Sequence, residues 1–469
     1  MLHISYECYP FAKVGGMADV VGALPKYQTA LDARASVVMP HFNRDWDQYG
    51  TLESVFEGGF HLDWEYIRFV VLRHPEVEGF ELYSVGIPGK FDRPEIYSYR
   101  DDVQRSVAFQ RAVLTWLSAM DAATRPQVLH CHDHHTGLIP FMAAHAYEFA
   151  ELNRIATCFT IHNAAYQGAF SWDLLRLLPA FHGDRSGLLD WNDAINPLAS
   201  AIKCAWHFNT VSRGYLDELF HSGHGLEGLI RSEAGKASGI LNGIDTAVWD
   251  PASDPLLEVH LKRSIDVFKR KSKAEVCAGT DLDPKLPIYL FIGRLAYEKG
   301  ADMLASILGD FMSHYDDVQC IVLGSGDPQI ENKLRHLEQF FHRRARTFIM
   351  YNETLAHRLY AGCDFLLMPS RVEPCGLNQM YCMRYGGIPI VRRIGGLRDT
   401  VEPLSESGGN GYVFDHLEIN EVRNVLSASR RLYQDGKQMS KVRQRNISID
   451  FSWEHSAKQY LDTYASLLA

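Results

Sequence analysis

The chain has 469 residues, enough for two or three domains of about 150 residues each. Hydrophobic residues make up 46% of it, close to the ~45–50% of globular domains, which indicates a packed core and excludes a wholly disordered chain. The net charge of −10 argues against nucleic acid as a partner, because nucleic-acid-binding proteins carry a basic excess.

The nine cysteines are scattered singly along the chain, without a CxxC pair. This pattern disfavours both a disulfide framework and a structural zinc site, and it is typical of buried thiols in a reducing compartment. The first residues do not resemble a secretory signal, and the sequence contains no apolar run of ~18 residues. We therefore expect a cytoplasmic protein that does not interact with a membrane.

Short β-rich runs alternate with helix-like segments along nearly the whole chain, which is typical of βαβ units and parallel sheets. In the first half we predict strands at 35–39, 67–72, 128–132, 156–162 and 207–211. In the second half we predict strands at 288–292, 319–323, 347–351, 364–368 and 388–391, and one helical face formed by Ile330, Leu334, Leu337 and Phe341. Each half has the content of a doubly wound α/β domain.

The boundary between the two halves is predicted to lie between Asn242–Asp245 and Pro287. Asn242-Gly243 is a turn signal, the following 249–255 is rich in proline, and 281–287 leads into a new strand. Open parallel sheets bind ligands at the carboxyl ends of their strands. Two such domains can therefore enclose a ligand between them.

A glycine-containing loop lies near the N-terminus. Gly15 and Gly16 would let backbone amides approach a ligand, and Lys13 would add a positive charge. The loop matches neither GxGxxG nor a Walker sequence, so a plain turn before a helix is the simpler interpretation.

The segment 130–135 contains four histidines. Consecutive strand residues point to opposite faces, so these imidazoles cannot all converge on one metal ion, and we predict no metal site. We expect instead that the strand end delivers Asp133 and His135 to a cleft. His162 and Asn163 end the next predicted strand, where a hydrogen-bonded core histidine and a substrate contact are both reasonable.

Four features of the second half would suit a nucleotide sugar. Arg294 and Lys299 follow its first strand and could neutralise a diphosphate without a metal, although alone they also fit a solvated helix start. Glu373 follows the strand 364–368 and could bind sugar hydroxyls. The next backbone amides, at a predicted helix start, could bind phosphate because helix N-termini present free N–H groups. They belong to Cys375, Gly376, Leu377 and Asn378. Tyr351 lies where a base could stack.

Other sequence patterns point away from alternative chemistries. Asp281-Leu-Asp283 has the DxD form of some metal-dependent glycosyltransferases, but it lies in a proline-flanked linker, and we interpret it as a turn. The chain has no GxSxG elbow and no Walker A sequence.

Several motifs, in the same order, give the chain an almost end-to-end resemblance to glycosyltransferase family 5, the bacterial glycogen synthases and plant starch synthases. They are KVGGMADV from Lys13, HDHH from His132, FTIHNAAYQG from Phe159, GRLAYEKG from Gly293 and FSWEHSAK from Phe451. The resemblance implies a GT-B fold, in which two Rossmann-like doubly wound domains face each other across an interdomain cleft. It implies an N-terminal, acceptor-side domain over 1–245 that is joined by a C-terminal helix, 453–469, and a nucleotide-sugar-binding domain over 246–452.

The resemblance further implies the reaction. The family transfers glucose from ADP-glucose to the non-reducing end of an α-1,4-glucan with retention of configuration, and it requires no divalent metal or other cofactor. A GT-B enzyme that uses UDP-glucose or another acceptor is the alternative. A non-catalytic glucan-binding relative would not need a diphosphate clamp, and a phosphorylase would need a lysine-bound pyridoxal phosphate.

Residue roles are implied in the same way. Glu373 would hold glucose hydroxyls, Arg294 and Lys299 would bind the donor diphosphate, and His162 would touch the donor sugar. The implied donor-binding residues are Lys13, Gly15, Gly16, Asp133, Asn163, Tyr351, Cys375, Gly376, Leu377 and Asn378.

The sequence departs from the family pattern at three positions. Val14 stands for the usual threonine of the glycine loop, His134 for a tryptophan, and Asn378 for a threonine. These departures bear on donor preference and acceptor fit more than on the type of reaction.

Overall fold

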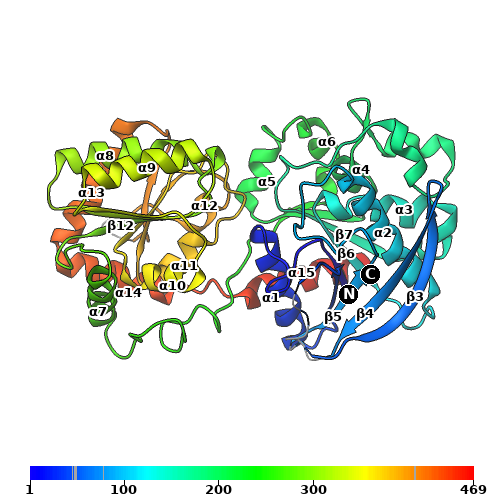
Figure 1. Cartoon of the computed structure of the whole chain (residues 1–469), viewed down its shortest axis with the longest axis horizontal. Coiled ribbons are helices and arrows are strands. Elements are labelled where there is room, and N and C mark those ends of the chain that lie inside the picture. The colour runs from blue at the N-terminus through cyan, green and yellow to red at the C-terminus, as the bar shows by residue number, and fades with distance from the viewer. Residues whose placement is uncertain (45, 47–49, 76, 78, 406–407) are drawn as a thin grey trace. The chain divides into compact units, whose positions relative to one another are not determined.

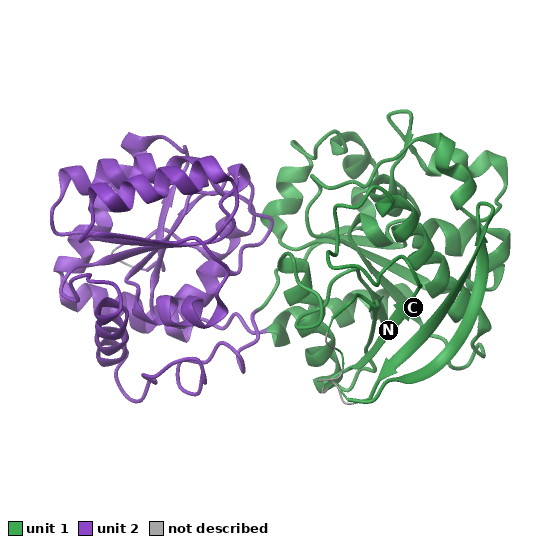
Figure 2. Ribbon diagram, viewed as in Figure 1, with its two compact units in different colours: residues 1–243, 453–469 green, residues 244–452 purple. Residues whose placement is uncertain are grey.

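The computed structural model describes every residue except 45, 47–49, 76, 78 and 406–407. The chain forms two compact units, which Figure 2 shows in different colours: unit 1 is Met1–Gly243 with Trp453–Ala469, and unit 2 is Ile244–Ser452. Both units are α/β and built on largely parallel sheets, so the predicted fold class is confirmed. None of the helices that the structure describes is sufficiently long and apolar to cross a bilayer.

Unit 1 contains a nine-stranded sheet in the order β11-β10-β7-β6-β1-β2-β5-β4-β3. The strands are β1 (Leu2–Ile4), β2 (Ser36–Pro40), β3 (Glu53–Leu62), β4 (Glu65–His74), β5 (Glu81–Gly86), β6 (Val128–His132), β7 (Ala156–Ile161), β10 (His207–Thr210) and β11 (Ala237–Gly239). β8 (Asp190–Trp191) and β9 (Ala194–Ile195) form a separate small ribbon. All pairings from β11 to β5 are parallel, whereas β4 pairs antiparallel with β5 and with β3.

Strand β1 was not predicted from the sequence. It is only three residues long, but all three are buried, and it pairs with both β6 and β2 at the centre of the sheet. A three-residue strand shows no periodicity, so only its neighbours in the sheet identify it. Strand β3 was missed for the opposite reason: it is a mostly exposed edge strand, and its sequence is rich in polar residues and glycine.

The helices of unit 1 are α1 (Gly16–Ala30), α2 (Asp102–Ala119), α3 (Ile139–His145), α4 (Pro197–Cys204), α5 (Arg213–Leu219), α6 (Glu227–Ser232) and α15 (Trp453–Leu468). Short 3₁₀ helices occupy His134–Thr136, Tyr147–Leu152, Trp172–Leu177, Gly183–Leu188 and Ala234–Lys236. The chain leaves unit 1 after Gly243 and returns to it at Trp453, where α15 begins. Helix α15 packs with α1 in a buried cluster that includes Val20, Leu24, Val128, Trp453, Ala457, Tyr460 and Tyr464.

Unit 2 contains a six-stranded sheet, all parallel, in the order β14-β13-β12-β15-β16-β17. The strands are β12 (Ile288–Ile292), β13 (Gln319–Leu323), β14 (Ala345–Phe348), β15 (Phe365–Met368), β16 (Ile388–Arg392) and β17 (Tyr412–Phe414). Its helices are α7 (Ile265–Ala278), α8 (Leu304–His314), α9 (Pro328–Phe340), α10 (Glu353–Gly362), α11 (Asn378–Arg384), α12 (Gly395–Thr400), α13 (Ile419–Gln434) and α14 (Gly436–Ser448), with 3₁₀ turns at Tyr297–Lys299 and Ala301–Met303.

Helices cover both faces of this second sheet. Figure 1 shows α8 and α9 on one side of the strands, and α7, α10, α11 and α14 on the other. The predicted apolar face at 330–341 lies on α9, where Ile330, Leu334 and Leu337 are buried. Phe341 follows the last residue of that helix and is partly buried against the same core.

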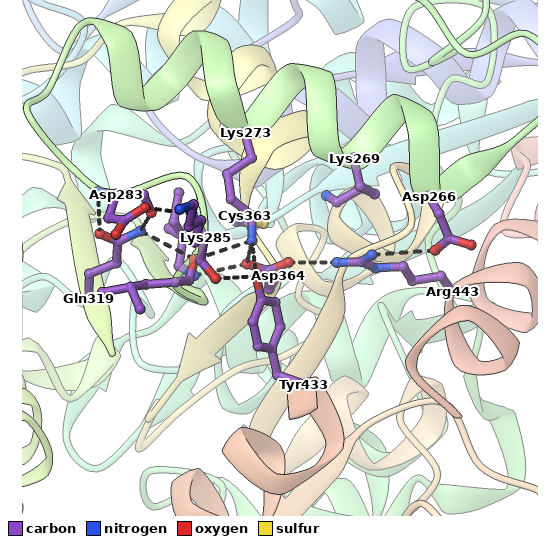
Figure 3. A network of polar contacts seen from close by, with 12 residues as sticks. Asp266, Lys269, Lys273, Asp283, Lys285, Gln319, Cys363, Asp364, Tyr433 and Arg443 are labelled. Carbon is purple, nitrogen blue, oxygen red and sulfur yellow. Dashed lines mark hydrogen bonds and ion pairs between the residues drawn. The ribbon is translucent and has the colours of Figure 1, made fainter. Parts of the chain in front are cut away.

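A buried ionic network holds the beginning of β15. The Asp364 carboxylate is fully buried and lies 2.6 Å from Lys273 Nζ and 2.5 Å from an Arg443 guanidinium nitrogen (Figure 3). It also accepts a hydrogen bond of 2.9 Å from the Ile288 amide at the start of β12. Although burial opposes the charged form, the Asp364 carboxylate raises the pKa of Lys273. One carboxylate thus ties α7 and α14 to the amino ends of two central strands.

Candidate functional site

The predicted site residues fall into two groups, one in each unit, and both groups lie where parallel strands end. In unit 1, Asp133 follows β6, and His162 and Asn163 follow β7. In unit 2, Arg294 follows β12 and Glu373 lies in the loop after β15. This is the edge of an open sheet at which α/β folds bind ligands.

Lys299 and Glu373 are in direct contact in unit 2. The Lys299 Nζ lies 2.7 Å and 2.8 Å from the two carboxylate oxygens of Glu373, and Ser370 Oγ donates a third bond of 2.9 Å. The Glu373 residue is buried at 6% exposure, while a quarter of the Lys299 side chain is accessible. The structure therefore brings together two residues that the sequence analysis had assigned to different parts of the donor.

Arg294 lies in the same strand-end loop as Lys299 but points into solvent more freely. Its side chain is 54% exposed and forms a 2.7 Å ion pair with Glu298. A second guanidinium, that of Arg371, forms a two-pronged pair with Asp302 at 2.6 Å and 3.0 Å. Arg294 is thus the more available of these two cations.

The segment from Cys375 to Asn378 forms a tight turn into α11. Gly376 has φ +74°, a conformation that favours glycine, and a Cβ there would meet Gln379 Oε1 at 2.6 Å. The α11 helix begins at Asn378 with Leu377 as its N-cap, so of the four residues expected to open it Cys375 and Gly376 precede the helix. The Asn378 side chain donates a 2.7 Å hydrogen bond to the carbonyl of Ile292, the last residue of β12. This departure from the family pattern therefore has a structural role in joining α11 to β12.

The glycine pair after β16 is required by close backbone approach. A Cβ at Gly395 would clash with the Glu373 carbonyl oxygen, and one at Gly396 would clash with that of Cys375. The Gly396 amide donates a 3.1 Å bond to the Glu373 carbonyl. The start of α12 thereby fixes the loop that carries the Glu373 carboxylate.

Tyr351 lies three residues beyond the end of β14. Its side chain is 73% exposed, and its hydroxyl is 3.4 Å from Glu353 Oε2. An accessible ring at this position agrees with the stacking role that the sequence analysis predicted, which stays a prediction.

The glycine loop of unit 1 leads into α1 at Gly16, in agreement with the simpler interpretation of a turn before a helix. The Gly15 and Val14 amides donate hydrogen bonds of 2.9 Å and 2.5 Å to one oxygen of the Glu7 carboxylate. Lys13 Nζ pairs with Asp19 at 2.7 Å. The Val14 and Gly15 amides are therefore engaged by the protein's own carboxylate, and a Cβ added at Gly15 or Gly16 would meet open space.

Asp133 organises the end of β7. One of its carboxylate oxygens accepts a hydrogen bond of 2.7 Å from the His162 amide and one of 3.4 Å from the Asn163 amide. Burial raises the pKa of Asp133 to about 7, even though these two amides favour the charged form. Asp133 itself has φ +55°. The three predicted residues Asp133, His162 and Asn163 thus form one local cluster.

The histidines around β6 separate into two groups. His130 and His132 are two residues apart on β6, so their side chains lie on the same face of the sheet, where they meet His3 of β1. One ring nitrogen from each of these three histidines lies within 4.8 Å of the other two. The four histidines of 130–135 do not converge, as predicted, but the cluster with His3 was missed because β1 was missed.

The other two histidines face elsewhere. His134 packs against Gly168, whose φ is +69° and where a Cβ would clash with the imidazole. His135 stacks on Tyr6 and Tyr97 with ring centroids 4.7 Å and 4.9 Å apart. Aromatic packing thus holds the His135 ring, and its delivery to a cleft stays a prediction.

Two polar residues of the site were not found from the sequence. Glu7 follows β1 and also accepts a 2.6 Å bond from the Tyr97 hydroxyl. The signal that singled out Glu373, a carboxylate just after a buried strand, applies equally to Glu7 once β1 is recognised. Ser370 lies three residues before Glu373, and only the fold of that loop brings its hydroxyl back to the carboxylate.

Family models match both parts of the chain. Residues 1–232 match the model described as starch synthase catalytic domain, and residues 273–447 match glycosyl transferases group 1. The two matched regions fall in unit 1 and unit 2 respectively.

Curated proteins are similar over the full length. A glycogen synthase of Flavobacterium johnsoniae is 44% identical over 468 residues, covering 99% of this chain and 98% of that protein. A glycogen synthase of Streptococcus pneumoniae is 34% identical over 479 residues, covering 100% and 99%.

Solved structures share the fold. The catalytic domain of starch synthase IV from Arabidopsis thaliana, bound to ADP and acarbose, has a TM-score of 0.89 and 29% identity, with 100% of this chain and 99% of that chain covered. Sucrose-phosphate synthase from Thermosynechococcus elongatus shares the fold alone. It is 16% identical with a TM-score of 0.62, and the match covers 100% of this chain and 98% of that chain.

Proposed function

This chain belongs to the family of bacterial glycogen synthases and starch synthases, and from that premise we propose that it transfers glucose from ADP-glucose to the non-reducing end of an α-1,4-glucan. It is a glycosyltransferase with a nucleotide sugar and a glucan as substrates. ADP as the nucleotide is our proposal, and its support is the ADP found in the related starch synthase structure.

The observation that carries the proposal is the contact between Lys299 and Glu373. An ammonium group held by both oxygens of a carboxylate at a strand end can offer its third N–H to a diphosphate. The same carboxylate still has lone pairs for sugar hydroxyls, since each carboxylate oxygen accepts more than one hydrogen bond. One ion pair can therefore link the leaving group and the sugar of a single donor molecule.

We assign the donor nucleotide to unit 2 and the glucan acceptor mainly to unit 1. Arg294 and Lys299 would bind the diphosphate, Tyr351 the base, and the segment from Cys375 to Asn378 would help to fix the donor. In unit 1, His162 would touch the donor sugar, and Asp133, Asn163 and the loop of Lys13, Gly15 and Gly16 would line the site.

We propose that the transfer retains configuration by same-face attack. A covalent route needs a carboxylate beside the anomeric carbon. Glu373 is already bonded to Lys299 and Ser370, which suits a carboxylate that orients other groups better than a nucleophile. In the same-face route the departing diphosphate accepts the proton of the acceptor hydroxyl. Arg294 and Lys299 stabilise the charge that develops on the diphosphate.

The experiment that tests the donor compares ADP-[¹⁴C]glucose with UDP-[¹⁴C]glucose for incorporation into glycogen. We expect at least about tenfold higher kcat/KM for ADP-glucose, which corresponds to about 1.4 kcal/mol of transition-state discrimination. A preference for UDP-glucose would favour the alternative donor, and no incorporation from either would contradict the proposed reaction.

Two further measurements test the remaining parts. Labelled product that an α-1,4-specific amylase digests completely supports retention, whereas resistant product contradicts it. We also propose that no metal or other cofactor takes part, so incorporation should persist in excess EDTA.

A further inference from the structure

A continuous chain of buried polar side chains runs from helix α15 and strand β10 to His162. Its members are Gln28 of α1, His3 of β1, His130 and His132 of β6, Thr160 of β7, Asn209 of β10 and Tyr464 of α15. All of these are at most 2% exposed, and His162 is 9% exposed. The mechanism above uses His162 alone, so the rest of the chain needs a separate explanation.

The four imidazoles of this chain are neutral near pH 7. Burial lowers the pKa of His3 and of His162 to about 3, and it lowers the pKa of His130 and His132 well below the usual range. A neutral imidazole has one N–H donor and one lone-pair acceptor. The direction of one hydrogen bond therefore fixes the direction of the next.

The direction begins at Asn209. Its side chain contacts the Thr210 carbonyl at 3.3 Å, the Tyr460 hydroxyl at 2.9 Å, Thr160 Oγ1 at 2.8 Å and Cys158 Sγ at 3.8 Å. A carbonyl only accepts, so the amide nitrogen of Asn209 faces Thr210 and its oxygen faces Thr160. The Thr160 hydroxyl must then donate to Asn209, and it can only accept from His130 Nε2, 2.6 Å away.

The next step runs through helix α15. Because His130 donates through Nε2, its Nδ1 carries the lone pair and must accept from the Tyr464 hydroxyl at 2.6 Å. Tyr464 has no second proton, so it accepts the 3.4 Å contact from the amide nitrogen of Gln28. The amide oxygen of Gln28 therefore faces His3 Nε2 at 2.8 Å.

The last step reaches His162. His3 donates to Gln28 through Nε2, so its Nδ1 accepts from His132 Nε2 at 3.1 Å. His132 Nδ1 then accepts from His162 Nε2 at 3.0 Å. His162 is left with its proton on Nε2 and a lone pair on Nδ1. Among the residues that the structure describes, none forms a hydrogen bond with that Nδ1.

We propose that this directional network selects the Nε2–H tautomer of His162, with Gln28 and Tyr464 as positioning residues, so that Nδ1 accepts a hydrogen bond from a hydroxyl of the donor sugar. The inference rests on the proposed function for the identity of that hydroxyl. The opposite tautomer would present an N–H to the sugar and reverse the polarity of the contact. Helix α15 thereby acts on the site without touching the substrate.

A metal ion at His3, His130 and His132 is the competing interpretation of the same cluster. Their ligand atoms are within 4.8 Å of one another. However, each of the six ring nitrogens already lies within 3.1 Å of a protein partner. A bound ion would take lone pairs that the network uses, so the two interpretations exclude each other.

The tautomer can be measured without any substrate. In full-length protein labelled with [¹⁵N]histidine, long-range ¹H–¹⁵N correlation distinguishes the two nitrogens of each ring, and a His162→Gln variant identifies the signals of His162. We expect protonation at Nε2 only. Protonation at Nδ1, or stoichiometric metal bound to the purified protein, would overturn the proposal.

A matched pair of variants tests the positioning role. Tyr464→Phe and Tyr460→Phe each remove one buried hydroxyl from α15, but only Tyr464 lies on the path, because the Tyr460 hydroxyl accepts from the Asn209 amide. We expect mixed His162 tautomers and about tenfold lower kcat/KM for ADP-glucose in Tyr464→Phe. Tyr460→Phe should lower the melting temperature by about as much as Tyr464→Phe does, but it should keep the single His162 tautomer.

Substitutions of Gln28 provide the rescue test. Gln28→Glu keeps an acceptor oxygen for His3 and should retain the Nε2–H tautomer, whereas Gln28→Met removes it and should give a mixture. An unchanged tautomer in both Gln28→Met and Tyr464→Phe would show that these residues do not position His162. If the tautomers respond as expected but the wild-type protein makes no glucan, the proposed function fails while the network stands.

Discussion

At the scale of single residues, the pair of Lys299 and Glu373 depends on a contact across 74 residues of sequence. Each was recognised separately because it follows a predicted strand. Their contact was not predictable, because it depends on β12 and β15 being neighbours in the sheet. The sequence located these residues, and the sheet order paired them.

Lys299→Ala should lower kcat for glucan synthesis by about 10²–10³-fold, the usual loss when one preorganised group that stabilises developing charge is removed. The fold should persist, because a quarter of the side chain is accessible. Initial rates at saturating donor, together with circular dichroism, check both statements.

Arg371→Ala is the matched control for this change. It also removes a cation that pairs with a carboxylate beside the same loop, and the two side chains are similarly exposed, at 22% and 25%. A loss of kcat in Arg371→Ala as large as that in Lys299→Ala would contradict the specific role of Lys299.

Asp133→Asn should change how stability depends on pH. The pKa of Asp133 is raised to about 7 in the folded protein, against about 3.9 in an unfolded chain, so between these values the folded state binds the extra proton. The wild type therefore loses stability as pH rises from about 4 to 7, and the asparagine variant lacks this loss. The free energy of unfolding of the variant relative to wild type should increase over that window and level off above it. Urea unfolding at several pH values measures this difference, and a constant difference would contradict the shift.

At the scale of elements, periodicity identified the longer buried strands but not the short or exposed ones. Strands β6, β7, β12, β13 and β16 are almost wholly buried runs of five or six residues, and each overlaps a predicted strand. Strand β1 has only three residues. Because it was missed, Glu7, which follows it, and the cluster of His3 with His130 and His132 were missed as well. A sequence pattern needs several residues to show a period, whereas a sheet needs only two neighbouring strands to position a third.

Asp364→Ala should lower the free energy of unfolding by about 3–5 kcal/mol, because it leaves the buried cations of Lys273 and Arg443 without a partner. Urea unfolding measures the loss. Asp310→Ala is the control, since its pair with Arg423 is partly exposed and such pairs contribute about 0–1 kcal/mol. Equal losses in the two variants would show that the Asp364 network does not hold β15.

At the scale of the whole molecule, unit 1 is assembled from two distant parts of the chain. Helix α15 supplies Trp453, Ala457, Tyr460 and Tyr464 to a core that also contains residues of α1, β6 and β7. Its contribution is therefore both apolar packing and, through Tyr464, the polar network that ends at His162.

Deleting 453–469 should destabilise unit 1 by several kcal/mol, because large buried side chains such as Trp and Tyr contribute about 3–5 kcal/mol each when truncated to alanine. Thermal unfolding and binding of a hydrophobic dye measure the effect. Deleting only 468–469 is the control, since Leu468 is 50% exposed. An unchanged melting temperature after the longer deletion would contradict the role of α15.

The sequence by itself determined the α/β class, the longer strands and the strand-end residues, because these follow from local periodicity and from the ends of apolar runs. Its motifs, through resemblance, indicated the family. The tertiary structure decided which partners those residues meet: Lys299 meets Glu373, Gly15 meets Glu7, and His162 is linked to Tyr464 through a buried network. Such contacts depend on sheet order and on a helix that returns from the end of the chain, and neither is encoded in any local pattern.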